Sequence, residues 1–297
     1  MYQQLHTAVV RLPGPLDIPA SLDVFRRWGD DGVDRWNGQV LLRTTCVEGQ
    51  TVPFACSTTG TVDKPAVAVT VAQAAQLPAI ASVVRTMFVS APKPLAALVA
   101  ADPVIARLES RYRGVRPVLQ SQLFTALIRS ISAQQVNLKW AATVRRRLAE
   151  TYGQRHTLGE YEVISLEADR IAAARVSELR TLQFTTRKSE YIIALASAVA
   201  AGRLDLEALR HAADAEVIAR LTALRGLGLW TAEWFLARAL GRARVAAGDL
   251  GVRKAVGAVY LQGQMPTEAQ VRELTAHWGE AAGVAQQLVL HALGFGV

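Results

Sequence analysis

The stretch that decides the fold of this chain runs from Leu224 to Trp234 and reads Leu-Arg-Gly-Leu-Gly-Leu-Trp-Thr-Ala-Glu-Trp. Its two glycines stand one residue apart, and they permit a tight turn whose backbone can approach another molecule closely. Apolar residues recur at helical spacing on both sides, so the sequence predicts two helices joined by this turn. The free amides at the start of the second helix would favour an anion such as phosphate.

Composition limits the class of protein. The 297 residues are 51% hydrophobic and 20% charged, which is typical of a globular chain, and the length predicts two domains. There are 33 Lys and Arg against 25 Asp and Glu, and the resulting net charge of +8 favours a polyanionic partner. The two cysteines, Cys46 and Cys56, are too few for a four-cysteine zinc or iron–sulfur site.

The chain carries no sign of export or membrane insertion. Its start lacks the charged-then-apolar pattern of a signal peptide. No apolar run reaches the ~18–20 residues needed to span a bilayer. We therefore expect a soluble protein of the bacterial cytoplasm, acting at the nucleoid without a membrane partner, and a monomer by default.

The hydrophobic pattern changes near residue 92, which predicts a domain boundary marked by Pro92 and Pro94. Residues 1–92 are expected to form an α+β domain, an antiparallel sheet plus a helix at Leu77–Phe88. The first two of its β-type runs predict a hairpin. These runs are Gln39–Val47, Val52–Ser57 and Ala66–Val71.

The remaining residues, 93–297, are expected to be helical almost to the end, so the fold class is mainly α with an N-terminal α+β domain. This region contains the two helices and their turn at 215–240, followed by a loop at 241–250. The expected helices are Pro103–Arg111, Gln120–Ser132, Asn137–Tyr152, Lys188–Ala201, Ala215–Leu224, Leu229–Leu240, Leu250–Tyr260, Thr267–Trp278 and Ala281–Leu293.

Asp249 is the carboxylate that follows the glycine turn most closely in a loop. It directly precedes the expected helix Leu250–Tyr260, so it is a candidate N-cap. It is equally a candidate for chemistry on a bound nucleic acid. The two roles are compatible, because a helix N-terminus favours an ionised carboxylate.

Together, the glycine turn, the Trp-Thr-Ala that follows it, and Asp249 with Gly-Val-Arg-Lys-Ala-Val behind it resemble the helix-hairpin-helix DNA glycosylases, most of all the bacterial 3-methyladenine DNA glycosylase II branch. The resemblance covers roughly residues 115–297 and extends more faintly over the N-terminal part. It implies two helical subdomains around a cleft. It also implies a glycosylase that flips alkylated purines out of duplex DNA and hydrolyses the N-glycosidic bond, with Asp249 as the catalytic residue.

Trp230 and Trp234 bear on the reaction and the base pocket. In relatives that also cut the backbone, a lysine at the position of Trp230 attacks the sugar; tryptophan cannot, so the resemblance implies a monofunctional enzyme that uses water. The two tryptophans are four residues apart and share one helix face. The resemblance makes them walls of the base pocket, where electron-rich rings attract a cationic alkylated base. Core packing is the alternative.

The resemblance also implies DNA contacts. Gln135, in the segment Arg129–Val136, corresponds to the side chain that fills the gap left by the flipped nucleotide, although a polar turn is the plainer interpretation. Gly226 and Gly228 would present backbone amides to phosphate, and Arg225 and Arg253 flank the expected site.

Two further expectations concern ions and charge. Hairpins of this family often hold a monovalent cation, Na⁺ or K⁺, through backbone carbonyls, here those near Thr222, Leu224 and Leu227; no organic cofactor is implied. The run Arg145-Arg146-Arg147 is expected to form a solvated helix face.

Two alternatives stay open. A non-enzymatic helix-hairpin-helix protein, such as a repair accessory factor, would keep the glycines and the basic charge without needing Asp249. A glycosylase for deaminated or oxidised bases would share the catalytic parts and differ in the pocket.

Overall fold

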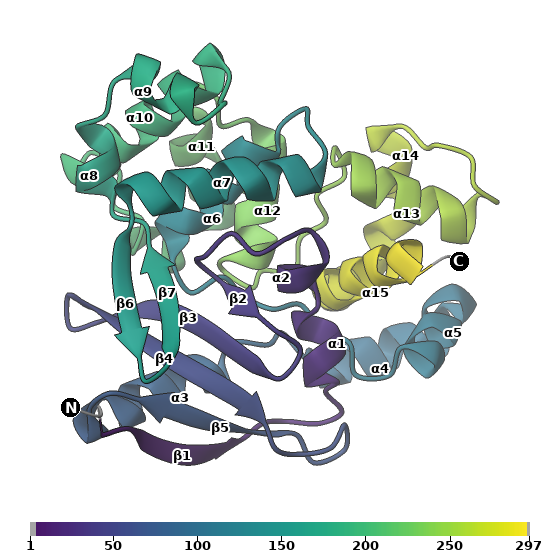
Figure 1. The fold of residues 1–297 in the computed structure, drawn as a ribbon. Coiled ribbons are helices and arrows are strands. Elements are labelled where there is room, and N and C mark those ends of the chain that lie inside the picture. Colours follow the sequence, from purple (N-terminus) through teal and green to yellow (C-terminus); the bar gives the residue numbers. More distant parts are fainter. Residues whose placement is uncertain (1–3, 296–297) are drawn as a thin grey trace.

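The computed structural model describes residues 4–295 (Figure 1). Its N-terminal part is a five-stranded antiparallel sheet in the order β1-β5-β4-β3-β2. The strands are β1 (His6–Arg11), β2 (Arg35–Trp36), β3 (Val40–Val47), β4 (Gln50–Thr58) and β5 (Ala66–Val71).

The predicted hairpin is confirmed as β3 and β4, which pair from Val47 opposite Gln50. Both turn residues between them, Glu48 and Gly49, have positive φ, and this geometry matches the twist of the flanking strands. The sequence analysis missed β1 and β2, because β1 is an edge strand and β2 is only two residues long.

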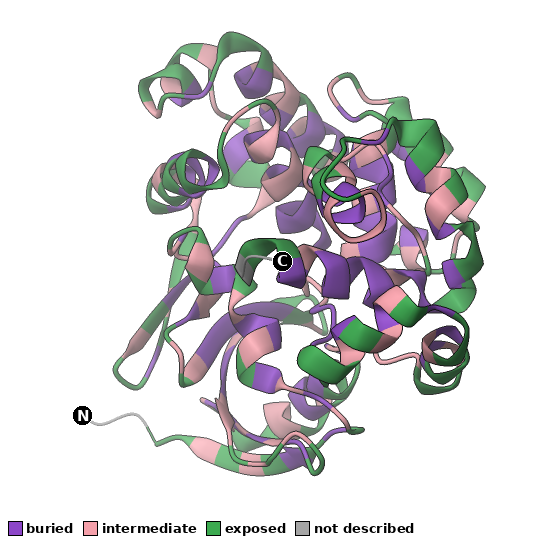
Figure 2. Cartoon of the chain, turned by 90° about the vertical axis from the view of Figure 1, so that its right-hand side faces the viewer, coloured by how far each residue is buried: buried purple, intermediate pink, exposed green. Residues whose placement is uncertain are grey.

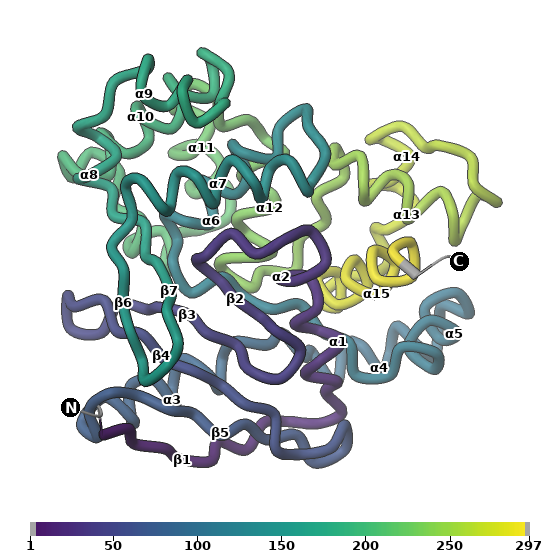
Figure 3. Tube along the Cα trace, in the orientation of Figure 1, coloured from purple at the N-terminus to yellow at the C-terminus, as the bar shows by residue number. Residues whose placement is uncertain are grey.

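The sheet buries one face against α3 (Leu77–Arg85), which follows the short 3₁₀ turn η1 (Ala74–Gln76). Large apolar side chains from both layers, including Phe54 and Ile80, are fully buried there. Two short helices, α1 (Ile18–Leu22) and α2 (Val24–Arg27), leave this layer and lie between the sheet and the C-terminal helices (Figures 1 and 3).

One helical core surrounds the buried Trp278. Pro92 and Pro94 stand in the first turn of a helix that the sequence analysis did not predict, where a proline loses no hydrogen bond. The elements of this core are α4 (Pro92–Ala101), α5 (Pro103–Arg111), α13 (Leu250–Tyr260), α14 (Glu268–Thr275), η3 (Ala276–Ala281) and α15 (Ala282–Phe295).

The other helical core is built around the fully buried Leu127 and Ile128. Its elements are α6 (Leu123–Ala133), α7 (Leu138–Tyr152), α8 (Ala168–Ala172), α9 (Val176–Thr181), α10 (Thr186–Ala200), η2 (Ala208–Arg210), α11 (Asp214–Thr222) and α12 (Leu229–Arg238). The chain therefore has the predicted mainly helical fold, with two helical groups beside an N-terminal sheet. Figure 2 shows their buried faces turned inward and their exposed faces turned to solvent.

The expectation that residues 93–297 are helical almost to the end is wrong at one place. Residues 154–165 form a second hairpin, β6 (Gln154–Leu158) and β7 (Tyr161–Ser165), which packs on β3 and β4 through Leu158 and Val163. The strands are too short for their alternation to stand out in the sequence, and much of their partner surface is the distant N-terminal sheet.

The expectation of a solvated arginine face on α7 is wrong for Arg145. Its side chain lies on the buried face of α7 and donates to Asp31 at 3.0 Å, while Arg146 is exposed and pairs with Glu150. Asp31 also pairs with Arg129 of α6. Burial opposes ionisation of Asp31, yet these two arginines bring its pKa below the ordinary value. This ion-pair cluster fastens the loop after α2 to α6 and α7.

Across the described residues, none of the helices has both the length and the apolar character that a bilayer crossing requires.

Candidate active site

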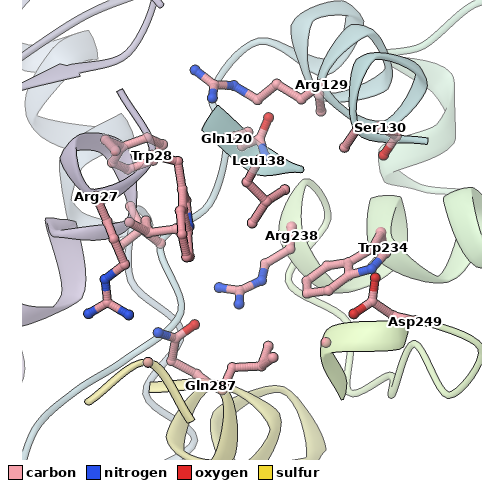
Figure 4. Close-up of a pocket in the computed structure, with 18 of the residues that line it drawn as sticks. Arg27, Trp28, Gln120, Arg129, Ser130, Leu138, Trp234, Arg238, Asp249 and Gln287 are labelled. Carbon is pink, nitrogen blue, oxygen red and sulfur yellow. The ribbon is translucent and has the colours of Figure 1, made fainter. Parts of the chain in front are cut away.

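A cavity of about 500 Å³ lies where the two helical cores meet the N-terminal part. Its wall combines α2, α6, α12, the start of α13 and α15, elements that are up to 270 residues apart in the chain. Figure 4 shows side chains from all these directions turned into the space. Asp249, Trp230 and Trp234 all line it.

Asp249 is held at both carboxylate oxygens. It is the N-cap of α13, and its Oδ1 accepts a hydrogen bond from the amide of Val252 at 2.9 Å. Its Oδ2 accepts from Nε1 of Trp230 at 2.8 Å. Within residues 4–295, no basic side chain forms an ion pair with it. The geometry therefore combines the cap with a charge that is fixed in orientation and available to the cavity.

The two tryptophans of α12 are half-buried and serve different neighbours. Trp230 orients Asp249 through its indole nitrogen. Trp234 packs against the core around Trp278 on one side, and the guanidinium of Arg238 lies 5.1 Å from its ring centroid. Both rings also line the cavity, so Trp234 combines the wall position with the core packing that the sequence left as the alternative.

Sequence reasoning missed several cavity residues. Arg238 comes from the last turn of α12, Gln287 from α15 and Trp28 from the end of α2. In Figure 4 the Trp28 and Trp234 rings lie on opposite sides of the cavity, with the Arg238 guanidinium between them. No local sequence pattern predicts that these residues line the cavity, because only the tertiary fold brings residues 28, 238 and 287 together.

Arg238 is the more unusual of these groups. Removal from water lowers the pKa of its guanidinium to about 10, and the nearby charge of Asp249 offsets part of that shift. The group is still protonated at neutral pH. Unlike Arg129 and Arg145 in the same cavity wall, it has no ion-pair partner among the described residues.

The glycine turn between α11 and α12 has two differently constrained glycines. Gly226 has φ of 94°, and a Cβ built on it would lie 2.2 Å from the ring of Tyr191. Gly228 is the N-cap of α12 with extended backbone, and a Cβ there would meet nothing within 4 Å. Gly226 is therefore required by the fold itself, whereas the surroundings of Gly228 are open.

The loop between α6 and α7 lies against this turn, because Gln134 Nε2 donates to the carbonyl of Gly226 at 2.8 Å. Gln135 follows with a left-handed φ of 55° and an exposed side chain, and it does not line the cavity. Leu138 does line the cavity and is 44% exposed. The prediction that Gln135 fills the gap in DNA remains a prediction.

The two predicted basic contacts are placed differently. Arg225 is exposed at the turn, stacks over Tyr191 at 5.9 Å and lies 3.9 Å from Glu190. Arg253 is half-buried on α13, and its Nε donates to the carbonyl of Pro266 at 2.8 Å. The hydrogen bond to Pro266 thus gives Arg253 a role in the fold, in addition to the predicted contact with DNA.

Comparison with known proteins agrees with this geometry. Residues 128–281 match the family model described as HhH-GPD superfamily base excision DNA repair protein. A DNA-3-methyladenine glycosylase of Bacillus subtilis is 28% identical over 182 residues, which is 61% of this chain and 60% of that protein. The match thus spans less than two thirds of the relative's length.

Solved structures share the fold over nearly the full chain. A 3-methyladenine DNA-glycosylase from Archaeoglobus fulgidus superposes with a TM-score of 0.86 at 22% identity, covering 97% of this chain and 98% of the other. An 8-oxoguanine glycosylase/lyase from Clostridium acetobutylicum, in complex with DNA, reaches 0.75 at 14% identity, covering 100% and 99%. The family match includes the glycine turn, Asp249 and both tryptophans, and this chain belongs to the HhH-GPD superfamily of base excision DNA repair proteins.

Proposed function

We propose that this protein is a monofunctional DNA glycosylase that removes alkylated purines from duplex DNA. The observation that carries the proposal is the doubly held carboxylate of Asp249 beside an aromatic cavity of about 500 Å³. The similarity to a DNA-3-methyladenine glycosylase of Bacillus subtilis supports the same substrate class.

The chemistry follows from charge. When the bond between the sugar C1′ and the purine nitrogen breaks, its electron pair leaves with the base and the sugar becomes an oxocarbenium-like cation. The fixed negative charge of Asp249 stabilises that cation. A water then adds to C1′, and its proton passes to Asp249 and on to solvent, which leaves an abasic site.

The cavity suits a flat, electron-poor base. The indole rings of Trp28 and Trp234 lie on opposite sides of it (Figure 4). An alkylated purine is cationic, so stacking between electron-rich rings stabilises it by ~0.5–2 kcal/mol per ring. A cationic base is also a better leaving group, because it departs neutral.

The proposal that the enzyme has no lyase activity rests on the lack of an amine nucleophile in the described part of the cavity wall. Trp230 occupies the position where bifunctional relatives carry lysine, and no lysine is among the described residues that line the cavity. An amine is required for a Schiff base with the sugar. The proposed reaction therefore stops at hydrolysis.

DNA would be bound by the turn and the neighbouring loop. The open surroundings of Gly228 and the amides at the start of α12 suit a phosphate, with Arg225 exposed beside them. Gln135, exposed on the adjacent loop, would enter the gap that the flipped nucleotide leaves.

A monovalent cation would fit the same turn. Within the part of the chain that the structure describes, the carbonyls of Thr222 and Leu227 accept no backbone hydrogen bond, and that of Leu224 accepts one from the amide of Leu227. Neutral carbonyl oxygens are suitable ligands for Na⁺ or K⁺. Bound there, the cation would supply a positive charge for a DNA phosphate oxygen.

The test compares the wild type with Asp249→Asn on methylated duplex DNA, with free bases measured by chromatography. Wild-type protein should release methylated purines and leave abasic sites that are cut only by added alkali. The variant should lose about 10²–10³-fold in rate, the usual cost of removing one such electrostatic contact. Equal release by both proteins would refute the role of Asp249. Wild-type protein that binds DNA and releases nothing would instead identify a binding module, and borohydride trapping of wild type on DNA would refute monofunctionality.

A further inference from the structure

Among the polar side chains of the cavity that the proposed reaction does not use are Arg238 and Gln287. The guanidinium of Arg238 has stacking contact with Trp234 but no carboxylate partner among the described residues. Arg238 is half-buried at the cavity wall, so its guanidinium can donate to an acceptor that a ligand brings into the cavity.

The second group is the amide of Gln287. Its side chain is only 7% exposed, and its Oε1 has no hydrogen-bond partner within the described chain. Buried side-chain oxygens in native proteins nearly always have a donor. The neighbouring Gln286 follows that rule, since its Oε1 accepts from the amide of Ala246 at 2.8 Å. Gln287 therefore points to a missing donor.

Both groups face the same space. Arg238 and Gln287 line one cavity, and in Figure 4 both side chains point into it. A base that stacks on Trp28 would meet both groups, because the Arg238 guanidinium lies on the Trp234 side of the cavity. The pair offers charged donors from the guanidinium next to an acceptor from the amide.

This arrangement complements one purine edge better than the other. A guanine-type ring carries a carbonyl oxygen at position six beside an N1–H donor. An adenine-type ring carries an amino donor at position six beside an N1 without hydrogen. Facing Arg238, the carbonyl gains a charge-assisted bond, whereas the amino group places donor against donor.

We propose that Arg238 and Gln287 read this edge of the everted purine, and that the site consequently prefers methylated guanines to methylated adenines. The inference rests on the proposed glycosylase function. Arg238 donates to the six-position carbonyl, and Gln287 Oε1 accepts from N1–H. A phosphate bound by Arg238 is the competing interpretation, and it predicts no discrimination between the two purines.

The guanidinium also favours departure of the base. As the glycosidic bond breaks, the base gains the bonding electron pair and passes from cationic to neutral. The fixed positive charge of Arg238 repels the cationic base while it is still attached to the sugar, but it does not repel the neutral base that leaves. Arg238 thus lowers the barrier to base release at some expense of ground-state affinity.

The test uses DNA treated with a methylating agent, which carries 3-methylguanine and 3-methyladenine together. The two bases share the methyl position and differ at their Watson–Crick edges. Arg238→Met should lower the ratio of their release rates by about tenfold or more, and Gln287→Leu by about two- to tenfold. Arg238→Lys, which keeps a charged donor, should recover part of the ratio. The exposed Arg113→Met, outside the cavity, is the matched control and should leave the ratio unchanged.

Each outcome decides the proposal. An unchanged ratio in Arg238→Met, with or without an equal loss of rate for both bases, overturns base reading. Wild-type protein that releases no methylated base refutes the glycosylase proposal separately. In that case, binding of the free bases, measured by quenching of tryptophan fluorescence, still tests whether Arg238 and Gln287 recognise the purine edge. Tighter binding of 3-methylguanine than of 3-methyladenine by the wild type, lost in Arg238→Met, supports the inference, and equal binding overturns it.

Discussion

The hydrogen bond from Trp230 to Asp249 provides the sharpest test of how the carboxylate is held. Trp230→Phe removes the indole N–H that donates to Oδ2 at 2.8 Å and keeps an aromatic ring at the same place. The amide of Val252 still holds Oδ1 at 2.9 Å. The substitution therefore frees one oxygen of the carboxylate without removing its charge or its cap.

The expected magnitude follows from the type of bond. A hydrogen bond to a charged group contributes ~1.5–3 kcal/mol, and each ~1.4 kcal/mol of transition-state stabilisation is tenfold in rate. We expect the single-turnover rate of base release to fall about ten- to a hundredfold. The affinity for DNA should change by less than about threefold, because a phenyl ring can still line the cavity.

The assay measures base release from methylated duplex DNA with enzyme in excess, alongside DNA affinity by gel shift. Trp140→Phe is the matched control, since this exposed indole on α7 is not among the residues that line the cavity. It should keep the rate within about threefold. A wild-type rate in Trp230→Phe would refute the positioning argument, as would a loss that appears entirely in DNA affinity.

Three other predictions concern the turn, the buried ion pairs and pH. Gly226→Ala should destabilise the fold by more than ~2 kcal/mol in urea unfolding, since its Cβ would meet a tyrosine ring at 2.2 Å, whereas Gly228→Ala should cost ~0.5 kcal/mol and instead weaken DNA binding. Asp31→Asn should cost ~3–5 kcal/mol because it leaves the buried Arg145 without its carboxylate, while Arg129 keeps Asp34, against less than ~0.5 kcal/mol for the exposed Glu150→Gln; similar losses for both would contradict this account. Burial, followed by the positive charge of a nearby arginine, lowers the pKa of His291, so the neutral form contributes stability above the unfolded-state pKa of ~6.5, and that stability declines as pH falls below it. His291→Phe should reduce the slope of stability against pH between about 6.5 and 5, and an unchanged slope would refute the assignment.

Much of the helical architecture was predictable because its signals are local. The helices at Pro103–Arg111 and Leu250–Tyr260 begin and end where the sequence analysis placed them. Each starts at an aspartate that caps it, and each has apolar residues at helical spacing. The β3–β4 hairpin was predictable for the same reason, since its Glu-Gly turn separates two β-type runs.

Other elements could not be found in this way. The β6–β7 hairpin and the buried Arg145 both depend on contacts with the N-terminal part, through Leu42 and Ala55 in one case and Asp31 in the other. A short strand or a single arginine has no distinctive periodicity, so its environment is set by residues more than a hundred positions away.

The amino-acid sequence alone determined the glycine turn, the capped aspartate behind it and the family to which they point, because a turn and a cap depend on neighbouring residues. Only the tertiary structure decided that Trp28, Arg238 and Gln287 share a cavity with Asp249. The cause is geometric. A base pocket must surround its ligand, and side chains can approach from opposite directions only when distant segments of the chain are folded against each other.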